Sequence, residues 1–595
     1  MKSYMKDYPR PQLVRKNWQN LNGEWAFLFD DENVGEKYEW FAAFPTDHKK
    51  IQVPFTYETK LSGINEQEHH KNIWYNRMLE LTEEELEKKK VLLHFEGSDF
   101  YTKVWVNGTF VGSHKGGYAR FSFDITNCVS AGVNDITVKV EDSKSLAQPR
   151  GKQRWMNDNF GCWYVQTTGI WKTVWTEVVE ETYLSSLKIT PDVKNKKVDM
   201  VYEIATDCFG GDKCTDMYIE TTITYQGTLI NKSMKAISGE RVSDSISVNL
   251  RSEDPWGIHL WTPENPQLYD MEIKVICNGN AVDIVSSYFG MREIAIDKGN
   301  ITLNGHVLYQ RLILDQGYWE DSHLTAPSEE ALIEDIEKIQ ALGFNGLRKH
   351  MKVEDERFLY WCDVKGMLVW SEMAAFYEFD DKAVEEFTKE WLEVVRQNYN
   401  HPCIITWTPF NESWGVPEIK TDVKQQRFTE SIYYLTKSID HMRPVVVNDG
   451  WEHTISDIIT LHDYEEDGDA FSKRYAEHLN EIMTGETYFN FIKTAFADGY
   501  EYKGQPVIIS EYGGIAFSSD VEGQWGYGNM VTSEEQFLKR YDKITTAIKN
   551  LPYAVGFCYT QVSDVQQEIN GLMTADRRFK IAPEKIKEIN CRTGN

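Results

Sequence analysis

The 595-residue sequence predicts a multidomain chain of two β-sandwiches followed by a (β/α)8 TIM barrel. Up to about residue 296, short runs of alternating apolar and polar residues are broken by Gly, Asn and Asp, as in all-β domains. From about residue 297, eight apolar runs alternate with mostly helical stretches, as in a closed barrel of parallel strands. We expect a jelly roll over 1–182, an immunoglobulin-like sandwich over 183–296 and the barrel over 297–595.

The first sandwich is predicted from strands that follow one another closely along the chain. Examples are the runs 25–29, 91–95, 102–106 and 135–140. The pair Asn107-Gly108 is a strong signal for a two-residue hairpin turn, because both residues tolerate the positive φ that such a turn needs. Many strands at this spacing are typical of a jelly-roll sandwich.

The second sandwich repeats the same all-β pattern over a shorter stretch. Its clearest runs are 198–204, 217–225, 245–250 and 268–276. The length of the region suits one immunoglobulin-like sandwich. No linker rich in Pro, Gly or Ser separates the predicted units, so we expect them to pack tightly against one another.

The barrel begins with a strand predicted at 307–314. Ser328 then caps a helix whose apolar side chains recur every three or four residues until Gly343 ends it. A long polar segment, 463–505, is expected to form a wall or lid of the site. The remaining predicted strands are 344–348, 367–370, 404–408, 445–448, 458–461, 507–510 and 555–559, and the remaining helices are 354–365, 382–399 and 423–440.

The composition disfavours several classes of function. A net charge of −28 argues against nucleic acid or anionic membranes as partners, because both require basic patches. The nine cysteines are scattered without a CxxC pair, which indicates a reduced, cytoplasmic setting rather than a disulfide framework. The N-terminus has no apolar signal segment and the chain has no 18-residue apolar run, so we expect neither secretion nor a membrane span.

The buried run 404–408 ends at a polar pair, Asn411-Glu412. A carboxyl group at the mouth of a buried strand, with Phe410 and Trp414 beside it, is expected to be partly desolvated. Desolvation would raise its pKa and keep it protonated near neutrality, as a general acid must be. Taken alone, the glutamate could equally cap the next helix.

A second carboxylate strengthens the functional interpretation. The run 507–510 ends at Glu511, and Gly513-Gly514 then let backbone or ligand come close. Strands four and seven lie across a barrel, and both glutamates stand at carboxyl ends, so both are expected to face one mouth. Glu511 would then be ionised and attack an anomeric carbon, while Glu412 would protonate the leaving oxygen and afterwards activate water.

Several longer motifs make a family resemblance specific. The chain resembles glycoside hydrolase family 2, the β-galactosidase, β-glucuronidase and β-mannosidase family, along nearly its whole length. The matching stretches are 18–25, 104–108, 149–153 (Pro-Arg-Gly-Lys-Gln), 168–171, 261–269, 289–292, Asn411-Glu412 and 510–514 (Ser-Glu-Tyr-Gly-Gly).

The resemblance implies a sugar-binding jelly roll, an immunoglobulin-like domain and a catalytic barrel. It also implies a retaining mechanism through a covalent glycosyl-enzyme, with Glu412 as acid/base, Glu511 as nucleophile and Asn411 as a substrate contact. The two carboxyl groups should then stand about 5–5.5 Å apart. A non-catalytic carbohydrate-binding protein is the remote alternative, and loss of turnover in Glu412 and Glu511 variants would distinguish the two.

Other barrel positions resemble the family less directly. Arg348 resembles the family's arginine that lies beside the nucleophile. The alternative is that Arg348 only forms a salt bridge at the surface. His350 resembles a sugar-contacting histidine, although the family's usual spacing is one residue longer. Tyr464 matches the family's tyrosine that donates a hydrogen bond to the nucleophile. The alternative is that Tyr464 is an aromatic residue packed in the core.

Three further substrate-binding candidates come from the ends of barrel strands. Asp315 stands where an acid could bind a sugar hydroxyl, or could cap a helix. Trp451 and Tyr559 could stack on a sugar ring, although aromatic residues at strand ends are often part of the core.

The sugar is left open by the sequence. Glucuronidases of the family carry an Asn-x-Lys motif, whose lysine pairs with the sugar carboxylate, shortly before a stretch that corresponds to 571–577 here. In this chain Glu568-Ile569-Asn570 stands at that place without a lysine. Glu568 would repel a uronate. Magnesium-dependent galactosidases of the family have a glutamate ligand where this chain has Phe376. We therefore expect no metal and no other cofactor.

A neutral β-galactoside is the first expectation for the substrate. A β-galacturonide is the rival, because Arg348, Lys349 and Lys352 could pair with an acid; a β-glucuronide or another exo-cleaved β-sugar such as an arabinoside stays open. The aglycone pocket is expected from loops such as 463–505 and 516–530, and a homo-oligomer is expected by analogy with the family.

Overall fold

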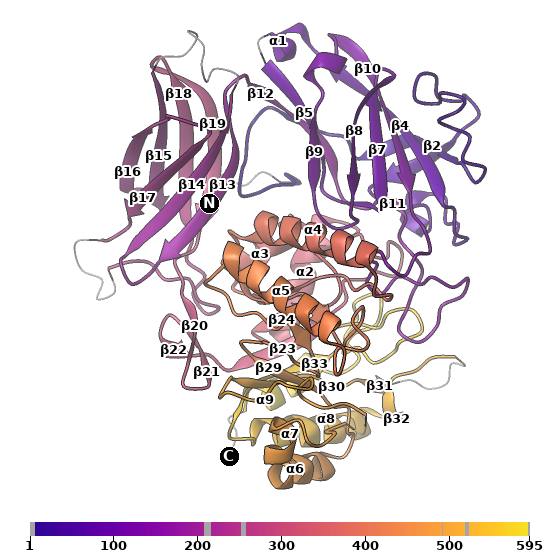
Figure 1. Ribbon diagram of the computed structural model, residues 1–595, viewed down its shortest axis with the longest axis vertical. Helices are drawn as coiled ribbons and strands as arrows, with labels where there is room; N and C mark the ends of the chain where they lie inside the picture. Colours follow the sequence, from indigo (N-terminus) through magenta and orange to yellow (C-terminus); the bar gives the residue numbers. More distant parts are fainter. Residues whose placement is uncertain are drawn as a thin grey trace.

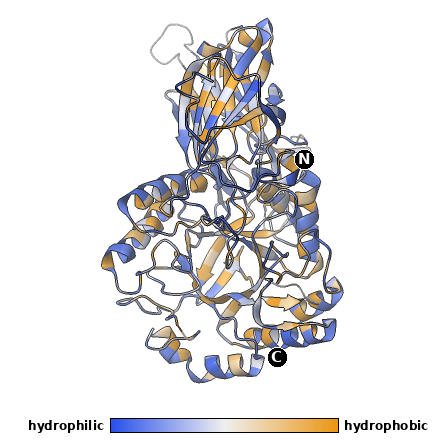
Figure 2. Ribbon diagram, turned by 90° about the vertical axis from the view of Figure 1, so that its right-hand side faces the viewer, coloured by the Kyte–Doolittle hydropathy of each residue, from blue (hydrophilic) through white to orange (hydrophobic). Residues whose placement is uncertain are grey.

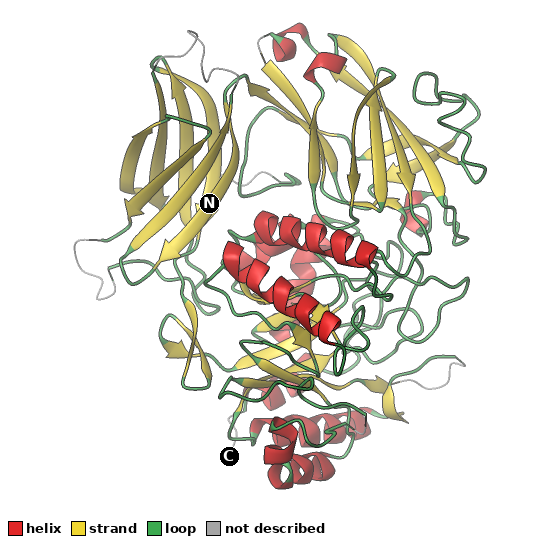
Figure 3. Ribbon diagram, viewed as in Figure 1, coloured by secondary structure: helices red, strands yellow, loops and turns green. Residues whose placement is uncertain are grey.

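The computed structural model describes residues 6–87, 89–206, 216–250, 257–490, 492–517 and 523–592. Two β-sandwiches lie side by side, and the barrel lies beneath both of them (Figure 1). Coloured by secondary structure, the sandwiches are almost entirely strand, whereas the barrel region carries the long helices (Figure 3). The predicted fold class is confirmed, while the boundaries at 182/183 and 296/297 stay predictions.

The first sandwich packs a four-stranded sheet against a six-stranded sheet. Side chains such as Trp25, Phe27 and Tyr75 fill the space between them and are fully buried. The expected hairpin is present, since Asn107 and Gly108 both have positive φ between β7 and β8. The four-stranded sheet is β1 (Trp18–Asn20), β12 (Val174–Glu180), β5 (Lys89–Phe95) and β9 (Phe121–Asp124), and the six-stranded sheet is β3 (Lys49–Val53), β2 (Gly23–Phe29), β4 (Asn72–Leu81), β10 (Gly132–Glu141), β7 (Tyr101–Val106) and β8 (Thr109–Lys115).

Short elements complete this unit. They are η1 (Lys60–Ser62), α1 (Glu83–Leu86), η2 (Thr126–Cys128) and the two-stranded pair β6 (Ser98–Asp99) and β11 (Gly169–Ile170).

The second sandwich packs three antiparallel strands against four. Alternate residues of its strands point inward, as Val242 and Ile246 of β17 do, which is the expected two-residue period. The run predicted at 245–250 begins four residues earlier in the structure. The sheets are β13 (Tyr183–Asp192), β14 (Lys197–Ala205) and β17 (Arg241–Ser247), and β16 (Thr228–Ala236), β15 (Met217–Tyr225), β18 (Tyr269–Cys277) and β19 (Asn280–Phe289).

The entry to the barrel corrects one predicted strand. The run 307–314 is divided, because β22 (His306–Val307) turns back on β21 (Asn300–Leu303), which also pairs with β20 (Ile294–Asp297). The first barrel strand, β23 (Gln310–Asp315), starts only after Leu308 and Tyr309 and pairs in parallel with its neighbours.

Seven parallel strands form one curled sheet. Most of their residues are apolar, and several of the strands are orange in the hydropathy colouring (Figure 2). In sheet order they are β26 (Ile404–Thr408), β25 (Leu368–Glu372), β24 (Gly346–Lys349), β23, β33 (Ala554–Thr560), β30 (Val507–Gly513) and β29 (Ile459–His462).

The fifth strand is irregular, and this corrects the prediction of a strand at 445–448. Regular pairing is limited to β28 (Asn448–Asp449) beside β27 (Phe410–Asn411). The N–H groups of Val445 and Val447 donate instead to the side chains of Asp457 (2.8 Å) and Ser456 (2.9 Å). Side-chain acceptors therefore replace the neighbouring strand on one side only. On the other side the N–H of Val446 donates to the carbonyl of Trp407 at 3.0 Å, and Val445 forms a parallel bridge with Trp407.

The helices lie outside the sheet and match the sequence pattern closely. Ser328 caps the first of them, with its hydroxyl accepting from the N–H of Ala331. The helices of the outer ring are α2 (Glu329–Ala341), α3 (Glu356–Lys365), α4 (Asp381–Asn398), α5 (Val423–Ile439), α8 (Glu534–Lys549) and α9 (Pro583–Cys591).

The segment 463–505 is not the continuous lid that its polarity suggested. Its first part forms α6 (Gly468–Glu477) and α7 (Leu479–Met483), and α6 lies beside α8 on the outside of the barrel (Figure 1). The remainder returns to the mouth, where Asn490 donates to the carbonyl of His462 at 3.1 Å. The start of the segment, with Tyr464, and this returning part therefore both lie at the mouth, while α6 and α7 between them do not.

The first sandwich is docked onto the barrel through buried contacts. Glu390 of α4 accepts from the N–H groups of Tyr118 (2.6 Å) and Ala119 (3.2 Å). The N–H groups of Arg150 and Gly151 donate to the carbonyl of Ala375, each at 2.9 Å. A loop of the first sandwich thus reaches the end of the barrel where the parallel strands stop. None of the helices in the described ranges combines the length and hydrophobicity needed to cross a bilayer.

Candidate active site

Glu412 stands on a tight turn just after β27. Its φ is 54° and that of Ser413 is 59°, a left-handed conformation that non-glycine residues adopt only when their surroundings enforce it. The N–H of Glu412 donates to the carbonyl of Asp449 at 2.8 Å, and the N–H of Ser413 donates to Oδ1 of Asn448 at 2.9 Å. These bonds to the fifth strand fix the direction of the Glu412 side chain.

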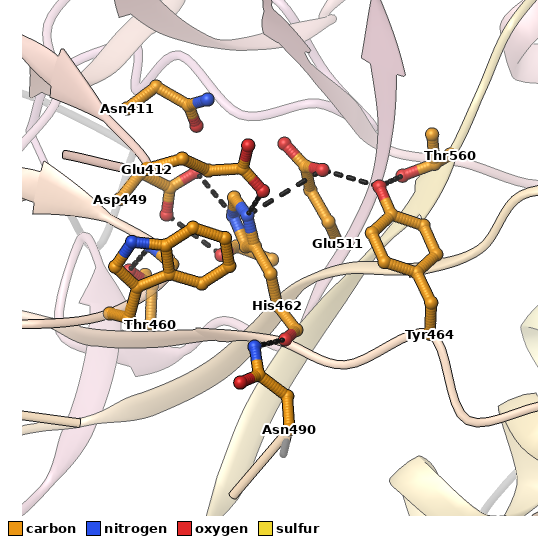
Figure 4. Close-up of polar contacts among 12 residues, drawn as sticks. Asn411, Glu412, Asp449, Thr460, His462, Tyr464, Asn490, Glu511 and Thr560 are labelled. Carbon is orange, nitrogen blue, oxygen red and sulfur yellow. Dashed lines mark hydrogen bonds and ion pairs between the residues drawn. The ribbon is translucent and has the colours of Figure 1, made fainter. Parts of the chain in front are cut away.

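Glu511 lies inside β30, so the sheet itself fixes its backbone. Tyr464 donates to one of its carboxylate oxygens (Figure 4). Arg348 donates to the other oxygen. The Tyr464 hydroxyl also lies 3.1 Å from Oγ1 of Thr560. Glu511 is 4% exposed, and it is therefore held by two donors with little access to water.

His462, at the end of β29, joins the two glutamates (Figure 4). Its Nδ1 lies 2.8 Å from Oε1 of Glu412 and 3.6 Å from Oε2 of Glu511, and its Nε2 lies 3.1 Å from Oδ2 of Asp449. One oxygen of Glu412 and one of Glu511 lie within 4.8 Å of each other. This spacing suits the direct attack of one carboxylate on a sugar carbon, because carboxyl groups that hold a water between them stand farther apart.

The imidazole of His462 carries a proton at neutrality. Burial lowers its pKa, but the surrounding carboxylates of Glu511, Asp449 and Glu412 outweigh burial and raise the pKa to about 10. Both ring nitrogens can then donate, Nδ1 to Glu412 and Nε2 to Asp449.

The pKa of Glu412 corrects the expectation from sequence. Burial does raise it, but the hydrogen bond and charge of His462, with the charges of Lys152 and Arg348, outweigh burial and hold the pKa below its ordinary value. The ring of Phe410, expected beside the carboxyl group, instead packs against other aromatic rings, with Phe387 at 4.7 Å between centroids. A cationic neighbour that the sequence did not reveal therefore decides the charge of Glu412.

Arg348 is fully buried at the centre of the site rather than in a surface salt bridge. It donates to Glu511 and Asp449, lies 3.2 Å from Glu372, and contacts Nδ1 of His350 at 2.9 Å. Burial raises the pKa of Glu372 to about 8 and lowers that of His350 well below its usual range. A neutral acid and a neutral imidazole therefore flank the arginine at pH 7.

Some side chains at the mouth hold buried polar atoms without hydrogen-bond partners among the described residues. Nδ2 of Asn411 and Nε1 of Trp451 are two of these atoms. The Trp451 ring lies 5.6 Å from that of His462, at the edge of the glutamate pair. Buried donors without partners are expensive, so both are suited to bonding a ligand.

Family models match the chain over almost its full length. The sugar binding domain of glycosyl hydrolases family 2 matches residues 18–175, and the model described as glycosyl hydrolases family 2 matches 182–292. The family's TIM barrel domain matches 294–593, more than half of the 595 residues. The chain belongs to glycoside hydrolase family 2. Its relatives include proteins named beta-galactosidase and beta-glucuronidase.

Relatives in family 2 carry two different activities in their names. A putative beta-glucuronidase from Formosa agariphila is 26% identical over 508 residues, which are 81% of this chain and 58% of that protein. A beta-galactosidase from Thermoanaerobacter pseudethanolicus is 25% identical over 543 residues, 86% of this chain and 68% of that protein. The chain thus spans little more than half the length of the Formosa protein.

Solved structures show the same fold at low identity. The crystal structure of Ruminococcus gnavus beta-glucuronidase aligns with a TM-score of 0.78 at 18% identity, covering 97% of this chain and 99% of that one. At this identity the likeness supports the architecture and carries nothing about the sugar.

Among the residues proposed by resemblance to family 2, Asp315 is corrected. Its two oxygens are used inside the protein, by Nζ of Lys349 at 2.7 Å and by the N–H of Gly317 at 2.8 Å. Lys349 also pairs with Glu354 at 2.6 Å, as Lys352 does at 2.8 Å. Neither lysine is therefore free to bind an acidic sugar, and with Arg348 already paired, the sequence-based reason for a galacturonide is lost.

Tyr559 is corrected as well. Its side chain is fully buried, packs 5.5 Å from Tyr512 and 4.9 Å from Tyr541, and accepts from the N–H of Ile515 at 3.3 Å. It belongs to the layer between sheet and helix and does not stack on a ligand. Phe376, which replaces a metal ligand of some family members, likewise packs in an aromatic core beside Phe387 at 5.3 Å.

Trp414 was expected beside the carboxyl group of Glu412, but the other aromatic residues around it at the mouth were missed from sequence. They form a continuous cluster next to Glu412, whose Oε2 accepts from Nε1 of Trp414 at 3.4 Å. Trp414 contacts Trp163 at 5.3 Å and Tyr377 at 5.4 Å between centroids. Trp163 comes from the first sandwich, and only the density of aromatic residues in the stretch 155–164 could have drawn attention to it. The cluster consists of Trp155, Phe160, Trp163, Tyr377 and Trp414.

Proposed function

We propose that the protein is a retaining exo-β-glycosidase, with Glu511 as nucleophile and Glu412 as acid/base. The observation that carries the proposal is the pair of carboxylates within 4.8 Å of each other, each with different partners. Arg348 and Tyr464 donate to Glu511 and orient its carboxylate, while Glu412 contacts the imidazole of His462.

In the first step, an oxygen of Glu511 attacks the anomeric carbon as the bond from that carbon to the leaving oxygen breaks. Glu412 gives its proton to the leaving oxygen. A covalent ester between the sugar and Glu511 remains. In the second step, the Glu412 carboxylate takes a proton from water, the hydroxide attacks the same carbon, and Glu511 leaves as a carboxylate.

The proton used by Glu412 is proposed to come from its pair with His462. One proton lies between Nδ1 of His462 and Oε1 of Glu412, which are 2.8 Å apart, and it is carried by the imidazole. Transfer to Glu412 produces the neutral acid without taking a proton from solvent. The proton returns when Glu412 later deprotonates water.

The leaving group is proposed to lie against the aromatic cluster. The acid must reach the leaving oxygen, and Trp414 contacts the same carboxyl group at 3.4 Å. The flat faces of Trp414 and Trp163 then suit a planar aglycone or the apolar face of a second sugar.

Two sugar classes are candidates. A neutral β-galactoside agrees with the galactosidases among the relatives, and a β-uronide agrees with the glucuronidases. The cations first considered for a uronide are paired internally, so any support for an acidic sugar must come from another residue.

The roles can be tested with Ala and Gln variants and nitrophenyl β-glycosides. Glu511→Gln should lower kcat by at least about 10⁴-fold, and Glu412→Gln by about 10²–10⁴-fold. Glu412→Ala should recover on dinitrophenyl glycosides, because that leaving group needs no proton. Azide should then give the β-glycosyl azide from Glu412→Ala and the α-glycosyl azide from Glu511→Ala.

Glu334→Gln, on the outer helix α2, is a matched control and should behave as the parent. Full turnover by Glu511→Gln, or azide products of the opposite configuration, would reject the assignment. A carbohydrate-binding protein without catalysis would bind sugars but show no turnover in any form.

A further inference from the structure

We propose that Lys152, carried into the barrel mouth by a loop of the first sandwich, binds the carboxylate of an acidic terminal sugar. The inference rests on the proposed glycosidase function and names its substrate class, a β-linked uronide. Lys152 belongs to the motif 149–153, and its charge also helps to lower the pKa of Glu412.

The backbone of this loop is fixed against the barrel. Gly151 has a φ of +59°, and a Cβ there would lie under 3.0 Å from the carbonyl oxygen of Met351, directly after His350. Tyr377 donates to the carbonyl of Gly151 at 2.5 Å. The N–H of Tyr164 donates to the carbonyl of Lys152 at 2.9 Å, which ties the two limbs of the loop together. Lys152 therefore starts from a rigid support beside the site.

The ammonium of Lys152 is buried without an anionic partner. The residue is 8% exposed, and its one hydrogen bond goes to Sγ of Cys162 at 3.1 Å. Within the described part of the chain, no carboxylate oxygen lies within 4.0 Å of its Nζ. Burial raises the pKa of the Cys162 thiol, so the sulfur is uncharged at neutrality. Two of the three N–H donors remain for a ligand.

The neighbouring buried lysines provide the contrast. Lys349 pairs with Asp315 and Glu354, and Lys352 pairs with Glu354 and two backbone carbonyls. Burial lowers the pKa of Lys152, but surrounding groups that include Glu568 and Glu412 outweigh burial and raise it. Within the described residues none of these carboxylates makes a direct ion pair with the ammonium, so a ligand can supply that contact. A carboxylate supplies it more fully than a sugar hydroxyl does.

The position of Lys152 suits a group on the bound sugar. Its charge acts on both Glu412 and His350, lowering the pKa of each, so the ammonium lies within electrostatic reach of both residues. The ring of Trp163 lies beneath its Nζ, 5.9 Å away at the centroid. A sugar whose anomeric carbon meets Glu511 would therefore extend toward Lys152.

Glu568, which the sequence suggested would repel a uronate, is turned toward donors. Oε1 accepts from Nδ2 of Asn570 at 2.9 Å, and Oε2 accepts from the hydroxyl of Tyr164 and from Nε2 of Gln316 at 3.4 Å. Neutral donors thus satisfy both carboxylate oxygens of Glu568. The carboxylate also attracts the ammonium of Lys152. Repulsion of a uronate by Glu568 is reduced accordingly.

The test compares nitrophenyl β-galacturonide and β-glucuronide with nitrophenyl β-galactoside. The parent should have the higher kcat/KM on a uronide. In Lys152→Met the ratio of uronide to galactoside kcat/KM should fall by about 10- to 150-fold, the range for loss of one charge-assisted hydrogen bond. Lys152→Arg, which keeps the charge, should restore most of the ratio.

Binding gives a second measure that does not depend on turnover. In the Glu511→Gln background, calorimetry should show tighter binding of galacturonate or glucuronate than of galactose, and Lys152→Met should remove that difference. Unchanged melting temperatures would confirm that the variants fold.

A parent that prefers the galactoside, or equal losses on acidic and neutral substrates in Lys152→Met, would overturn the proposal. These outcomes leave the roles of Glu412 and Glu511 untouched. Failure of those roles would instead appear as full turnover by Glu511→Gln, whatever Lys152 does.

Discussion

At the scale of single residues, the charge on His462 organises the site. Three carboxylates surround a buried imidazole and raise its pKa to about 10. The same contact holds the pKa of Glu412 below its ordinary value. The two groups therefore titrate as a pair, and the pair keeps one proton over the whole neutral range.

This predicts a shift in the pH profile of His462→Gln. In the parent, activity should persist at high pH until the pair loses its proton, near the pKa of about 10 of His462. Without the imidazole, Glu412 must hold the proton alone, and a carboxyl group loses it at lower pH. The basic limb of kcat/KM should therefore move to lower pH, as measured over pH 5–10 (~0.5-unit steps).

Asn490→Ala is the control for this experiment. It removes the 3.1 Å bond to the His462 carbonyl but leaves the imidazole in place, so the basic limb should not move. A shift of the limb to higher pH in His462→Gln would show that His462 only depresses the pKa of Glu412 and supplies no proton.

At the scale of elements, the end of β30 depends on a glycine. Gly513 has a φ of +82°, and a Cβ there would lie under 3.0 Å from Cε2 and Cδ2 of Tyr559. Tyr559 is fully buried between Tyr512 and Tyr541 and has no room to move aside. The absence of a side chain at Gly513 thus allows the strand carrying Glu511 to pack against its neighbour.

Gly513→Ala is therefore expected to lower the free energy of unfolding by more than the left-handed backbone conformation alone accounts for. The left-handed conformation costs an alanine about 1–2 kcal/mol, and overpacking adds about 1–3 kcal/mol. Gly279→Ala is a matched control, since Gly279 has the same φ of +82° with nothing within 4 Å of the added Cβ. Denaturant unfolding should show the larger loss for Gly513→Ala, and equal losses would exclude the steric argument.

At the scale of the whole molecule, one buried arginine joins the two sandwiches. Arg15 donates to Glu177 of β12 at 3.0 Å and to Asp283 of β19 at 2.9 and 2.8 Å. It also donates to the carbonyl of Leu184 at 2.6 Å. The side chains are at most 5% exposed, so the network is almost free of solvent screening.

Arg15→Met should destabilise the protein by about 3–5 kcal/mol, because it leaves buried carboxylates short of a partner. The midpoint of thermal or urea unfolding measures the loss. Lys6→Met is the control: Lys6 pairs with Glu330 at the surface, with side chains 65% and 64% exposed, and should leave the midpoint unchanged. A small effect of Arg15→Met would mean that the sandwiches do not depend on this network.

The sequence by itself determined the features that a few neighbouring residues encode. The hairpin at Asn107-Gly108, the cap at Ser328, the alternation of helices and strands and the two glutamates at strand ends are all local patterns. Local patterns survive in the structure because dihedral preferences and periodicity act over short stretches of chain. They located Glu412 just after β27 and Glu511 within the last residues of β30.

Only the tertiary structure decided which charges meet. His462, Asp449 and Arg348 converge on the glutamates because the barrel closes, and Lys152 reaches the mouth because the first sandwich docks there. Asp315 and Tyr559 stand at strand ends like true site residues, yet they are used by Lys349 and by the core. The energy of a buried charge depends on partners far away in sequence, and no local pattern records them.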